Sequence, residues 1–269
     1  MSSIPVLSVR KLTTCFYSQK NRFIAVNNID IDLYAGKITA LIGGSGSGKS
    51  ATALSLINLI DNPGKVVSGE ITLFGEMISN NSERQWRKIR GSKIAMIFQE
   101  PRSALNPTIK IEKHFAEALS PELHKKSKTE KRQLYKEILS RLGLSHGDEL
   151  LNKYPFELSG GMCQRIMVGM GLLSGAKVLI ADEPTASLDL TTQAAILYEI
   201  DRLKALGIAI LLITHDLGVV AQMADDVYVM YQGNIVESDS VTALFDNPQH
   251  EYTQRLLATV IAGENNAIG

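Results

Sequence analysis

The sequence has little cysteine and no excess of charge of either sign, and each shortage excludes a class of protein. Cys15 and Cys163 are the only two cysteines and stand far apart, which excludes a disulfide framework or a cysteine metal site. Its 28 basic residues balance 28 acidic ones, which gives no footprint for binding nucleic acid. No apolar run is long enough to span a bilayer, and Met1 to Pro5 lacks the pattern of a secretion signal. We therefore expect reduced, non-catalytic thiols and a cytoplasmic protein that meets a membrane only through a protein partner.

The chain has the residue pattern of an α/β protein. Its 269 residues, 45% of them hydrophobic, predict one large domain with a helical insertion and a tail. Alternating apolar and polar residues at 6–12 and 24–33 predict an antiparallel β layer near the N-terminus. Buried strands are predicted at 38–42, 94–98, 178–181, 208–213 and 227–231. Helical patterns between several of them favour a mainly parallel core sheet, and residues 101–175 are predicted to be mostly helical, with a capping box at Ser127 and Glu130.

A glycine-rich segment joins the strand predicted at 38–42 to a helical pattern at 51–59. It reads Gly43-Gly44-Ser45-Gly46-Ser47-Gly48-Lys49-Ser50 and fits the pattern G-x-x-x-x-G-K-[ST]. In such a loop the backbone N–H groups curl around phosphates, and the helix N-terminus, here at Ala51, adds partial positive charge. Lys49 would reach the β- and γ-phosphates of ATP, and Ser50 would place its hydroxyl on Mg²⁺. The flanking strand and helix favour this interpretation over a glycine-rich turn without a ligand.

Two carboxylates, Asp182 and Glu183, follow the apolar strand predicted at 178–181. Ligands of open parallel sheets collect at the carboxyl ends of the strands. Asp182 suits Mg²⁺ through a water molecule, and Glu183 could polarise the attacking water as a general base. Two acids after a strand more often belong to a solvated loop, but their place behind a phosphate loop reverses that preference. These features predict a P-loop NTPase of unspecified family.

The stretch Leu158-Ser159-Gly160-Gly161-Met162, followed by Gln164-Arg165, lies between the phosphate loop and the acidic strand. It resembles the signature of ABC transporter ATPases, and its Met variant resembles that of the peptide and nickel importer branch. The resemblance implies that Ser159 and the amides of Gly160 and Gly161 bind the γ-phosphate held by the phosphate loop of a partner subunit. A Ser-Gly-Gly turn alone is common at the start of helices. Its position among the other motifs is what makes the resemblance specific.

Further elements of that family occur in the same order along the chain. Gln99 resembles the glutamine that senses the γ-phosphate and Mg²⁺, Ser187-Leu188-Asp189 resembles the D-loop, and Thr214-His215-Asp216 resembles the switch histidine region. A lone histidine after a strand is more often an ordinary residue, and only the ensemble assigns His215 to the γ-phosphate. The family stacks an aromatic ring on adenine, which implies Phe16, with Tyr17 beside it. A plain core or strand position is the alternative for either ring.

Two segments resemble the importer branch for oligopeptides, dipeptides and nickel. The run from Gln99 to Pro107 resembles QDPxxSLNP, a region that meets the permease in that branch. The run from Phe245 to Leu257 resembles FxxPxHPYTxxLL, with Glu251 at a usual proline, and Cys163 stands where the branch commonly has arginine. Peptide members usually continue into a longer cysteine-bearing tail. Its absence here favours nickel or metallophore uptake slightly over peptides.

The resemblance implies an ABC-type nucleotide-binding fold and an ATP-hydrolysing subunit of an importer at the cytoplasmic face of the inner membrane. We expect a RecA-like core with its β layer in 1–98 and 176–238, a helical signature subdomain in 99–175 and a C-terminal extension in 239–269. Two such domains, identical or paralogous, would close head to tail around Mg-ATP and drive permease subunits, which receive solute from an extracytoplasmic binding protein. The alternatives are an exporter ATPase, an ABC ATPase of nucleic-acid repair or translation, and a nucleotide-binding scaffold without hydrolysis.

Overall fold

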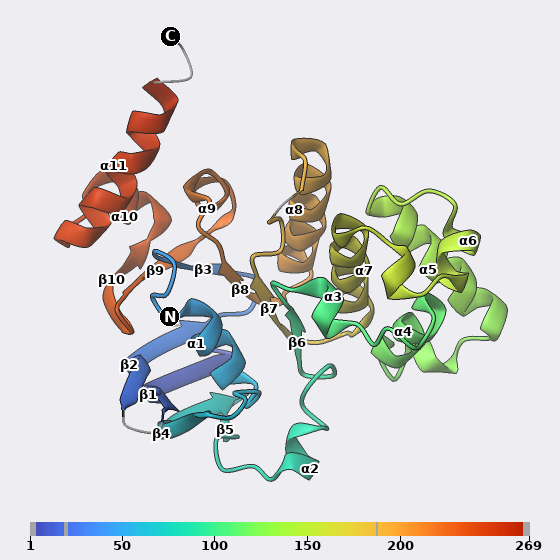
Figure 1. The fold of residues 1–269 in the computed structure, drawn as a ribbon, viewed down its shortest axis with the longest axis horizontal. Coiled ribbons are helices and arrows are strands. Elements are labelled where there is room, and N and C mark those ends of the chain that lie inside the picture. Colours follow the sequence, from blue (N-terminus) through green and yellow to red (C-terminus); the bar gives the residue numbers. More distant parts are fainter. Residues whose placement is uncertain (1–3, 19–20, 187, 266–269) are drawn as a thin grey trace. The chain divides into compact units, whose positions relative to one another are not determined.

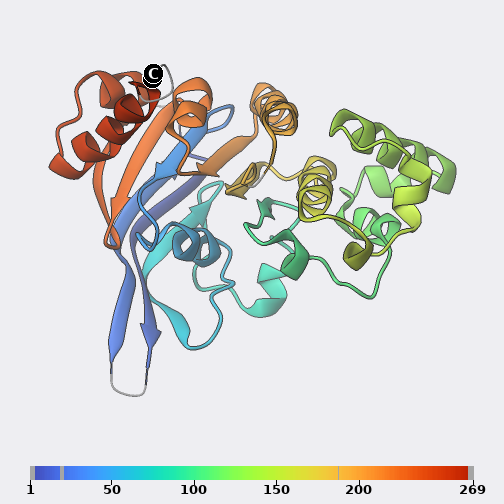
Figure 2. The same cartoon turned by 45° about the horizontal axis from the view of Figure 1, so that its top comes forward.

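The computed structural model describes residues 4–18, 21–186 and 188–265, and the chain divides into two compact units. The first unit comprises Met1–Arg87 and Ala209–Gly269, and the second comprises Lys88–Ile208. Figures 1 and 2 show the elements of both units. Among the described helices, none combines the length and the hydropathy needed to cross a bilayer.

A four-stranded antiparallel sheet forms the N-terminal layer of the first unit, in the order β2-β1-β4-β5 (Figure 1). Its strands are β1 (Leu7–Tyr17), β2 (Arg22–Leu33), β4 (Gly64–Leu73) and β5 (Glu76–Met77). The antiparallel layer is confirmed, with strands longer than expected. The sequence did not predict β4, because Gly69 interrupts its alternation. That glycine has φ +116°, and a Cβ there would stand 2.5 Å from Leu12 Cα, at an irregularity in the pairing with β1.

The first unit also contains four strands of the core sheet, in the order β10-β9-β3-β8. They are β3 (Ile38–Ile42), β8 (Ala209–Ile213), β9 (Asp226–Tyr231) and β10 (Asn234–Ser240). As predicted, β3 runs parallel to both β8 and β9, whereas β10 returns antiparallel to β9. Every residue of β3 and β8 is buried, which explains why both read as continuous apolar runs.

The helices of the first unit connect these strands or follow them. They are α1 (Lys49–Leu56), α2 (Glu83–Trp86), α9 (Leu217–Met223), α10 (Val241–Asp246) and α11 (Glu251–Asn265). Helix α1 is shifted from the predicted 51–59: it begins at Lys49 and ends at Leu56. It ends early because Asn58 adopts a left-handed conformation with φ +52°. The last two helices lie beside β10 in both views (Figures 1 and 2).

The second unit combines two parallel strands with a mostly helical segment. The strands at 94–98 and 178–181 and the helical content of 101–175 agree with the sequence prediction. The strands are β6 (Ile94–Ile97) and β7 (Val178–Asp182). The α-helices are α3 (Pro101–Ala104), α4 (Ile111–Ala118), α5 (Lys128–Arg141), α6 (Gly147–Asn152), α7 (Gly160–Leu173) and α8 (Leu190–Ala205), and 3-10 turns occur at Leu123–Lys125 and Pro155–Glu157. The capping box is confirmed: Ser127 N donates to Glu130 Oε2 at 2.8 Å, and Glu130 N donates to Ser127 Oγ at 3.3 Å.

Close packing brings α4, α5 and α7 together. The rings of Phe115 and Tyr135 meet at 5.4 Å between centroids, tilted by 60°. A Cβ at Gly169 would stand 3.0 Å from Ile138 and 3.2 Å from Phe115, so the glycine lets α7 approach both neighbouring helices. Behind them, Arg141 of α5 and Arg202 of α8 both donate to the buried carboxylate of Glu199. The ion pair between Arg141 and Glu199 therefore ties the helical segment to α8.

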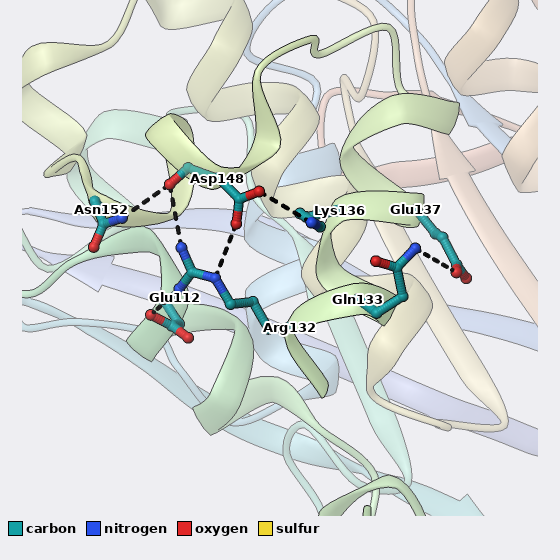
Figure 3. A network of polar contacts seen from close by, with 7 residues as sticks. All are labelled: Glu112, Arg132, Gln133, Lys136, Glu137, Asp148 and Asn152. Carbon is teal, nitrogen blue, oxygen red and sulfur yellow. Dashed lines mark hydrogen bonds and ion pairs between the residues drawn. The ribbon is translucent and has the colours of Figure 1, made fainter. Parts of the chain in front are cut away.

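A polar network centred on Arg132 joins α4, α5 and α6 (Figure 3). Its guanidinium donates to Glu112 Oε2 at 2.8 Å and to Asp148 Oδ1 at 3.0 Å, and Lys136 Nζ lies 3.0 Å from Asp148 Oδ2. The cations of Lys136 and Arg132 lower the pKa of Asp148 from its ordinary value. Asn152 also donates to the Asp148 carbonyl at 2.9 Å. The network is thus a polar clamp at the surface of the helical segment.

We expect Arg132→Gln to lower the midpoint of thermal unfolding more than Gln133→Ala does. Among the described residues, the Gln133 side chain bonds only to exposed Glu137 of the same helix (Figure 3). The difference should shrink in concentrated salt, which screens partly exposed charges. Because the folded pKa of Asp148 is lowered, its contribution is complete above the ordinary pKa and is lost as the pH falls through the lowered one. Calorimetry of both variants across salt and pH checks this, and equal midpoints at low salt would contradict it.

Candidate functional site

The glycine-rich segment leaves the carboxyl end of β3 and turns into α1 through backbone conformations that favour glycine. Gly43 has φ +152°, and a Cβ there would stand 2.1 Å from the carbonyl oxygen of Met230. Gly48 has φ +110°, and its Cβ would stand 2.2 Å from the carbonyl oxygen of Ala25. Both positions therefore require glycine for two reasons, the left-handed backbone and the lack of space.

Hydrogen bonds fix the loop formed by these residues. Lys49 Nζ donates to the carbonyl oxygens of Gly43 at 2.8 Å and Gly44 at 3.0 Å, so the ammonium group lies across the loop. Gly233 N, in the turn between β9 and β10, donates to Ser47 O at 2.9 Å. The loop is thus held both from within and from the neighbouring hairpin.

The loop fits the phosphates of a nucleotide. Ser45 and Gly46 are exposed at its tip, and no described atom lies within 4 Å of a Cβ placed on Gly46. The backbone then enters α1, whose first residues, Lys49, Ser50 and Ala51, are half-buried. Room at the tip, an ammonium group and a helix N-terminus together are suited to bind a phosphate chain.

His215 lies at the same sheet edge as the loop. The register of β3 and β8 pairs Leu41 with Ile213, so Gly43 and His215 each stand two residues beyond that pair. The side chain of His215 is exposed, in a turn where Asp216 N donates to Thr214 Oγ1 at 3.0 Å. The Asp216 side chain in turn accepts from Val219 N at 3.1 Å and caps α9. The strand register of the first unit therefore places the predicted histidine level with the start of the phosphate loop.

The second unit brings Gln99 and the two carboxylates to one edge in the same way. The register of β6 and β7 pairs Ile97 with Ala181, and Gln99 and Glu183 each stand two residues beyond that pair. Gln99 is exposed, whereas Asp182 and Glu183 are 3% and 8% exposed. The amide and the carboxylates thus lie at the carboxyl ends of neighbouring parallel strands, where we expected them.

Glu183 adopts a strained backbone conformation, with φ +50°. Non-glycine residues in this region cost about 1–3 kcal/mol and cluster at functional sites. The following residue, Pro184, accepts a hydrogen bond at 3.1 Å from Nε2 of Gln164, a buried residue of α7. The acidic loop is therefore connected to the helix that carries the predicted signature.

The signature residues open α7 as we predicted. Ser159 is the N-cap, its Oγ accepting from Met162 N at 3.2 Å, and Ser159 and Gly160 are exposed while Gly161 is half-buried. Arg102, just after Gln99 and in α3, donates to Leu158 O at 2.9 Å. The signature residues start a 14-residue helix. The first turn of a helix has backbone N–H groups without intrahelical partners, which is the chemistry that an anion requires.

Neither cysteine is placed for reaction. Cys163 is buried within α7, and that burial raises the pKa of its thiol, which keeps the group protonated near neutral pH. Cys15 is buried in β1, where Arg22 Nε donates to its Sγ at 3.1 Å.

Phe16 is described by the structure, whereas the D-loop is described only in part. Phe16 is half-buried on β1, and its Cε1 lies 2.7 Å from the position of a Cβ on Gly64, so the ring covers that glycine. Its contact with adenine stays a prediction. Ser187 lies outside the described residues. Leu188 reaches within 3.0 Å of a Cβ on Gly161, and Asp189 caps α8 by accepting from Thr192 N at 3.0 Å.

Several contacts of the site had no assigned role from the sequence. The sequence placed Gln164 beside the signature but did not predict its bond to Pro184 O. It placed Arg102 in the segment expected to meet the permease and did not predict its bond to Leu158 O. The carbonyl oxygens of Met230 and Ala25 lie close to Gly43 and Gly48. No sequence pattern predicts such backbone contacts. The motif around Tyr252 did mark that residue, but not its contact, a hydrogen bond of 2.7 Å from Gly44 N to its hydroxyl.

Comparison with known proteins now identifies the family. The family model for ABC transporters matches residues 26–186. The chain belongs to the ABC transporter family. It is 45% identical over 97% of its length to the peptidoglycan transport ATP-binding protein YejF of Agrobacterium fabrum (strain C58 / ATCC 33970) and 43% identical over 96% to the oligopeptide transport ATP-binding protein AppD of Bacillus subtilis (strain 168). These matches cover 48% of YejF and 80% of AppD.

Solved structures confirm the ABC fold. The ATP-binding cassette MJ0796, in a dimeric post-hydrolysis structure with ADP and Pi, superposes with a TM-score of 0.77 at 23% identity. The match covers 87% of this ABC chain and 98% of that one. The predicted fold class, an α/β ABC domain with an antiparallel layer and a helical insertion, is therefore confirmed.

Proposed function

We propose that this ABC chain is the ATP-hydrolysing subunit of a membrane importer and that Mg-ATP is its cofactor. The observation that carries the proposal is the placement of the motifs. In the first unit His215 stands level with the start of a phosphate loop, and in the second unit Gln99 stands level with Glu183. Family membership supports a nucleotide as the ligand of the phosphate loop.

Each residue then has a role that its chemistry supports. Lys49 and the loop amides would bind the phosphates, and Ser50, Gln99 and Asp182 would hold Mg²⁺, the aspartate through water. Bound Mg-ATP supplies the phosphoryl group and the cation that neutralises its charge. Glu183 orients the attacking water and accepts its proton, and His215 contacts the γ-phosphate.

A second ATPase subunit, either a copy of this chain or a paralogue, completes the proposed site. The exposed residues Ser159 and Gly160, together with Gly161, would bind the γ-phosphate on the partner's loop, in a head-to-tail dimer. Closure of that dimer would move the attached permease subunits, and hydrolysis would reset them. This places the chain at the cytoplasmic face of the membrane, with the segment from Gln99 to Pro107 toward the permease and a solute-binding protein as an indirect partner.

The solute is proposed to be a small peptide or a peptide-containing fragment. This preference rests on the relatives, whose names specify oligopeptide and peptidoglycan transport. The sequence favoured nickel or a metallophore by a small margin, and that remains the alternative. Uptake of a labelled tripeptide and of radioactive nickel, compared in cells with and without the gene, separates the two solutes.

We expect the purified chain, combined with its permease subunits and any paralogous ATPase, to hydrolyse ATP in Mg²⁺ and to lose turnover when EDTA removes the metal. Lys49 and the loop amides should still bind ATP without Mg²⁺, though more weakly. Phosphate release and binding of a fluorescent ATP analogue measure the two properties. Binding without turnover in the full assembly would favour the scaffold alternative, and absence of binding would refute the proposed function.

A further inference from the structure

The C-terminal helix α11 reaches the phosphate loop through Tyr252. Gly44 N, inside the glycine-rich loop, donates a hydrogen bond of 2.7 Å to the Tyr252 hydroxyl, although 208 positions separate the two residues. Both belong to the first unit. The contact is direct and involves a backbone group of the loop itself, so a change in the position of this hydroxyl changes the position of Gly44 N.

The helix that carries Tyr252 is firmly seated. Glu237 of β10 accepts from Gln249 N at 2.7 Å and from His250 N at 3.0 Å, just before the helix begins. Burial alone would raise the pKa of Glu237, but these hydrogen bonds outweigh it and hold the pKa below its ordinary value. Thr253, the residue after Tyr252, and Leu257, about one helical turn beyond it, are buried. Tyr252 is therefore presented to the loop from a fixed support.

The Tyr252 ring is positioned independently of its hydroxyl. It stacks on Tyr231 with the centroids 4.2 Å apart and the planes 28° from parallel. The hydroxyl is thus available for the loop and is not required to seat the helix. The loop in turn has limited freedom elsewhere, because Ser47 O is held by Gly233 N at 2.9 Å.

We propose that Tyr252 is a positioning residue for nucleotide binding: its hydroxyl fixes the phosphate loop through Gly44 and so makes the C-terminal extension part of the ATP site. This inference rests on the proposed function. It gives a role to the motif around His250 and Tyr252, which the hydrolytic roles above leave unused. Without the hydroxyl, the loop must be ordered by the nucleotide itself, which weakens binding.

The test compares Tyr252→Phe with Tyr231→Phe in the full assembly. The first variant keeps the stacked ring and removes the bond to Gly44. The second removes a hydroxyl that, among the described residues, accepts a hydrogen bond only from Gln232 Nε2, at 3.2 Å. For Tyr252→Phe we expect the KM for Mg-ATP to rise about three- to ten-fold, the effect of one hydrogen bond. The kcat should stay near wild type, because ground and transition states use the same loop.

A second readout does not depend on hydrolysis. Without nucleotide, amide hydrogen exchange in residues 43–48 should be faster in Tyr252→Phe than in wild type or Tyr231→Phe, while the unfolding midpoint of the chain stays close to wild type. An unchanged KM in an active Tyr252→Phe protein would overturn the inference, whatever its exchange rates, and so would an equal rise of KM in both variants. If the wild type itself neither binds nor hydrolyses ATP, the proposed function fails first, and the exchange data still decide whether Tyr252 restrains the loop.

Discussion

Glu183→Gln is expected to lower ATP turnover by about 100- to 10,000-fold, the usual contribution of a general base, while ATP binding persists. The amide has the shape of the carboxylate, so it fits the buried position at the end of β7 and keeps the left-handed backbone of the residue. It cannot accept a proton from water. Since the phosphate loop is unaltered, the variant should bind Mg-ATP and remain in the closed, ATP-bound dimer.

Phosphate release and size-exclusion chromatography in ATP check both parts of this prediction. Glu137→Gln is a suitable control, because Glu137 is an exposed carboxylate of the second unit that bonds only to Gln133 among the described contacts (Figure 3). The control should turn over ATP at the wild-type rate. Normal turnover by Glu183→Gln would show that another group activates the water.

Gly48→Ala is expected to weaken ATP binding by about 100-fold or more, since strain of about 1–3 kcal/mol at a left-handed position adds to a steric conflict. The new Cβ would stand 2.2 Å from Ala25 O and 2.7 Å from Met230 Cε. The side chain of Met230 can move, but the carbonyl of Ala25 belongs to β2 and cannot. The loop must therefore shift, and the amides that should bind phosphate shift with it.

Gly75→Ala separates strain from steric conflict. Gly75 has φ +78° in the turn between β4 and β5, and no described atom lies within 4 Å of its Cβ position. This variant should lose a little stability and bind ATP normally. Titration with a fluorescent ATP analogue, beside thermal unfolding of each variant, is the measurement. Equal affinity of the two variants would mean that the phosphate loop does not depend on the close approach at Gly48.

The sequence could predict those parts of the fold that depend on neighbouring residues. The strand at 38–42, the glycine loop and the capping box at Ser127 are local patterns, and the structure confirms all three. Strand β4 was missed because its apolar alternation is irregular. Its pairing with β1, a strand about 50 residues away in the sequence, has register shifts that local patterns do not show. The shifted limits of α1 have a similar cause, since the left-handed conformation of Asn58 overrides a helical pattern that continues beyond it.

For the candidate site, the sequence predicted which residues follow the strands. The strand register then aligns Gly43 with His215 in the first unit and Gln99 with Glu183 in the second. The sequence could not predict contacts made by backbone carbonyls, such as those of Ala25 and Met230 at the phosphate loop. It also could not connect Tyr252 with Gly44, because no spacing rule links a helix near the C-terminus to a loop near the N-terminus. The roles assigned to Phe16 and Glu183 stay predictions, and the Glu183→Gln variant addresses the second of them.

The burial of both thiols has a practical value for spectroscopy. Cys15 and Cys163 are inaccessible to maleimide reagents in the folded chain, so neither must be removed before labelling. A cysteine introduced at the exposed position Gln133 would carry a fluorophore or spin label as the dominant site. The native thiols would then serve as a reporter of unfolding, since they become labelled only when the protein opens. One protein preparation could in this way follow both the motion of α5 and the integrity of the fold during ATP turnover.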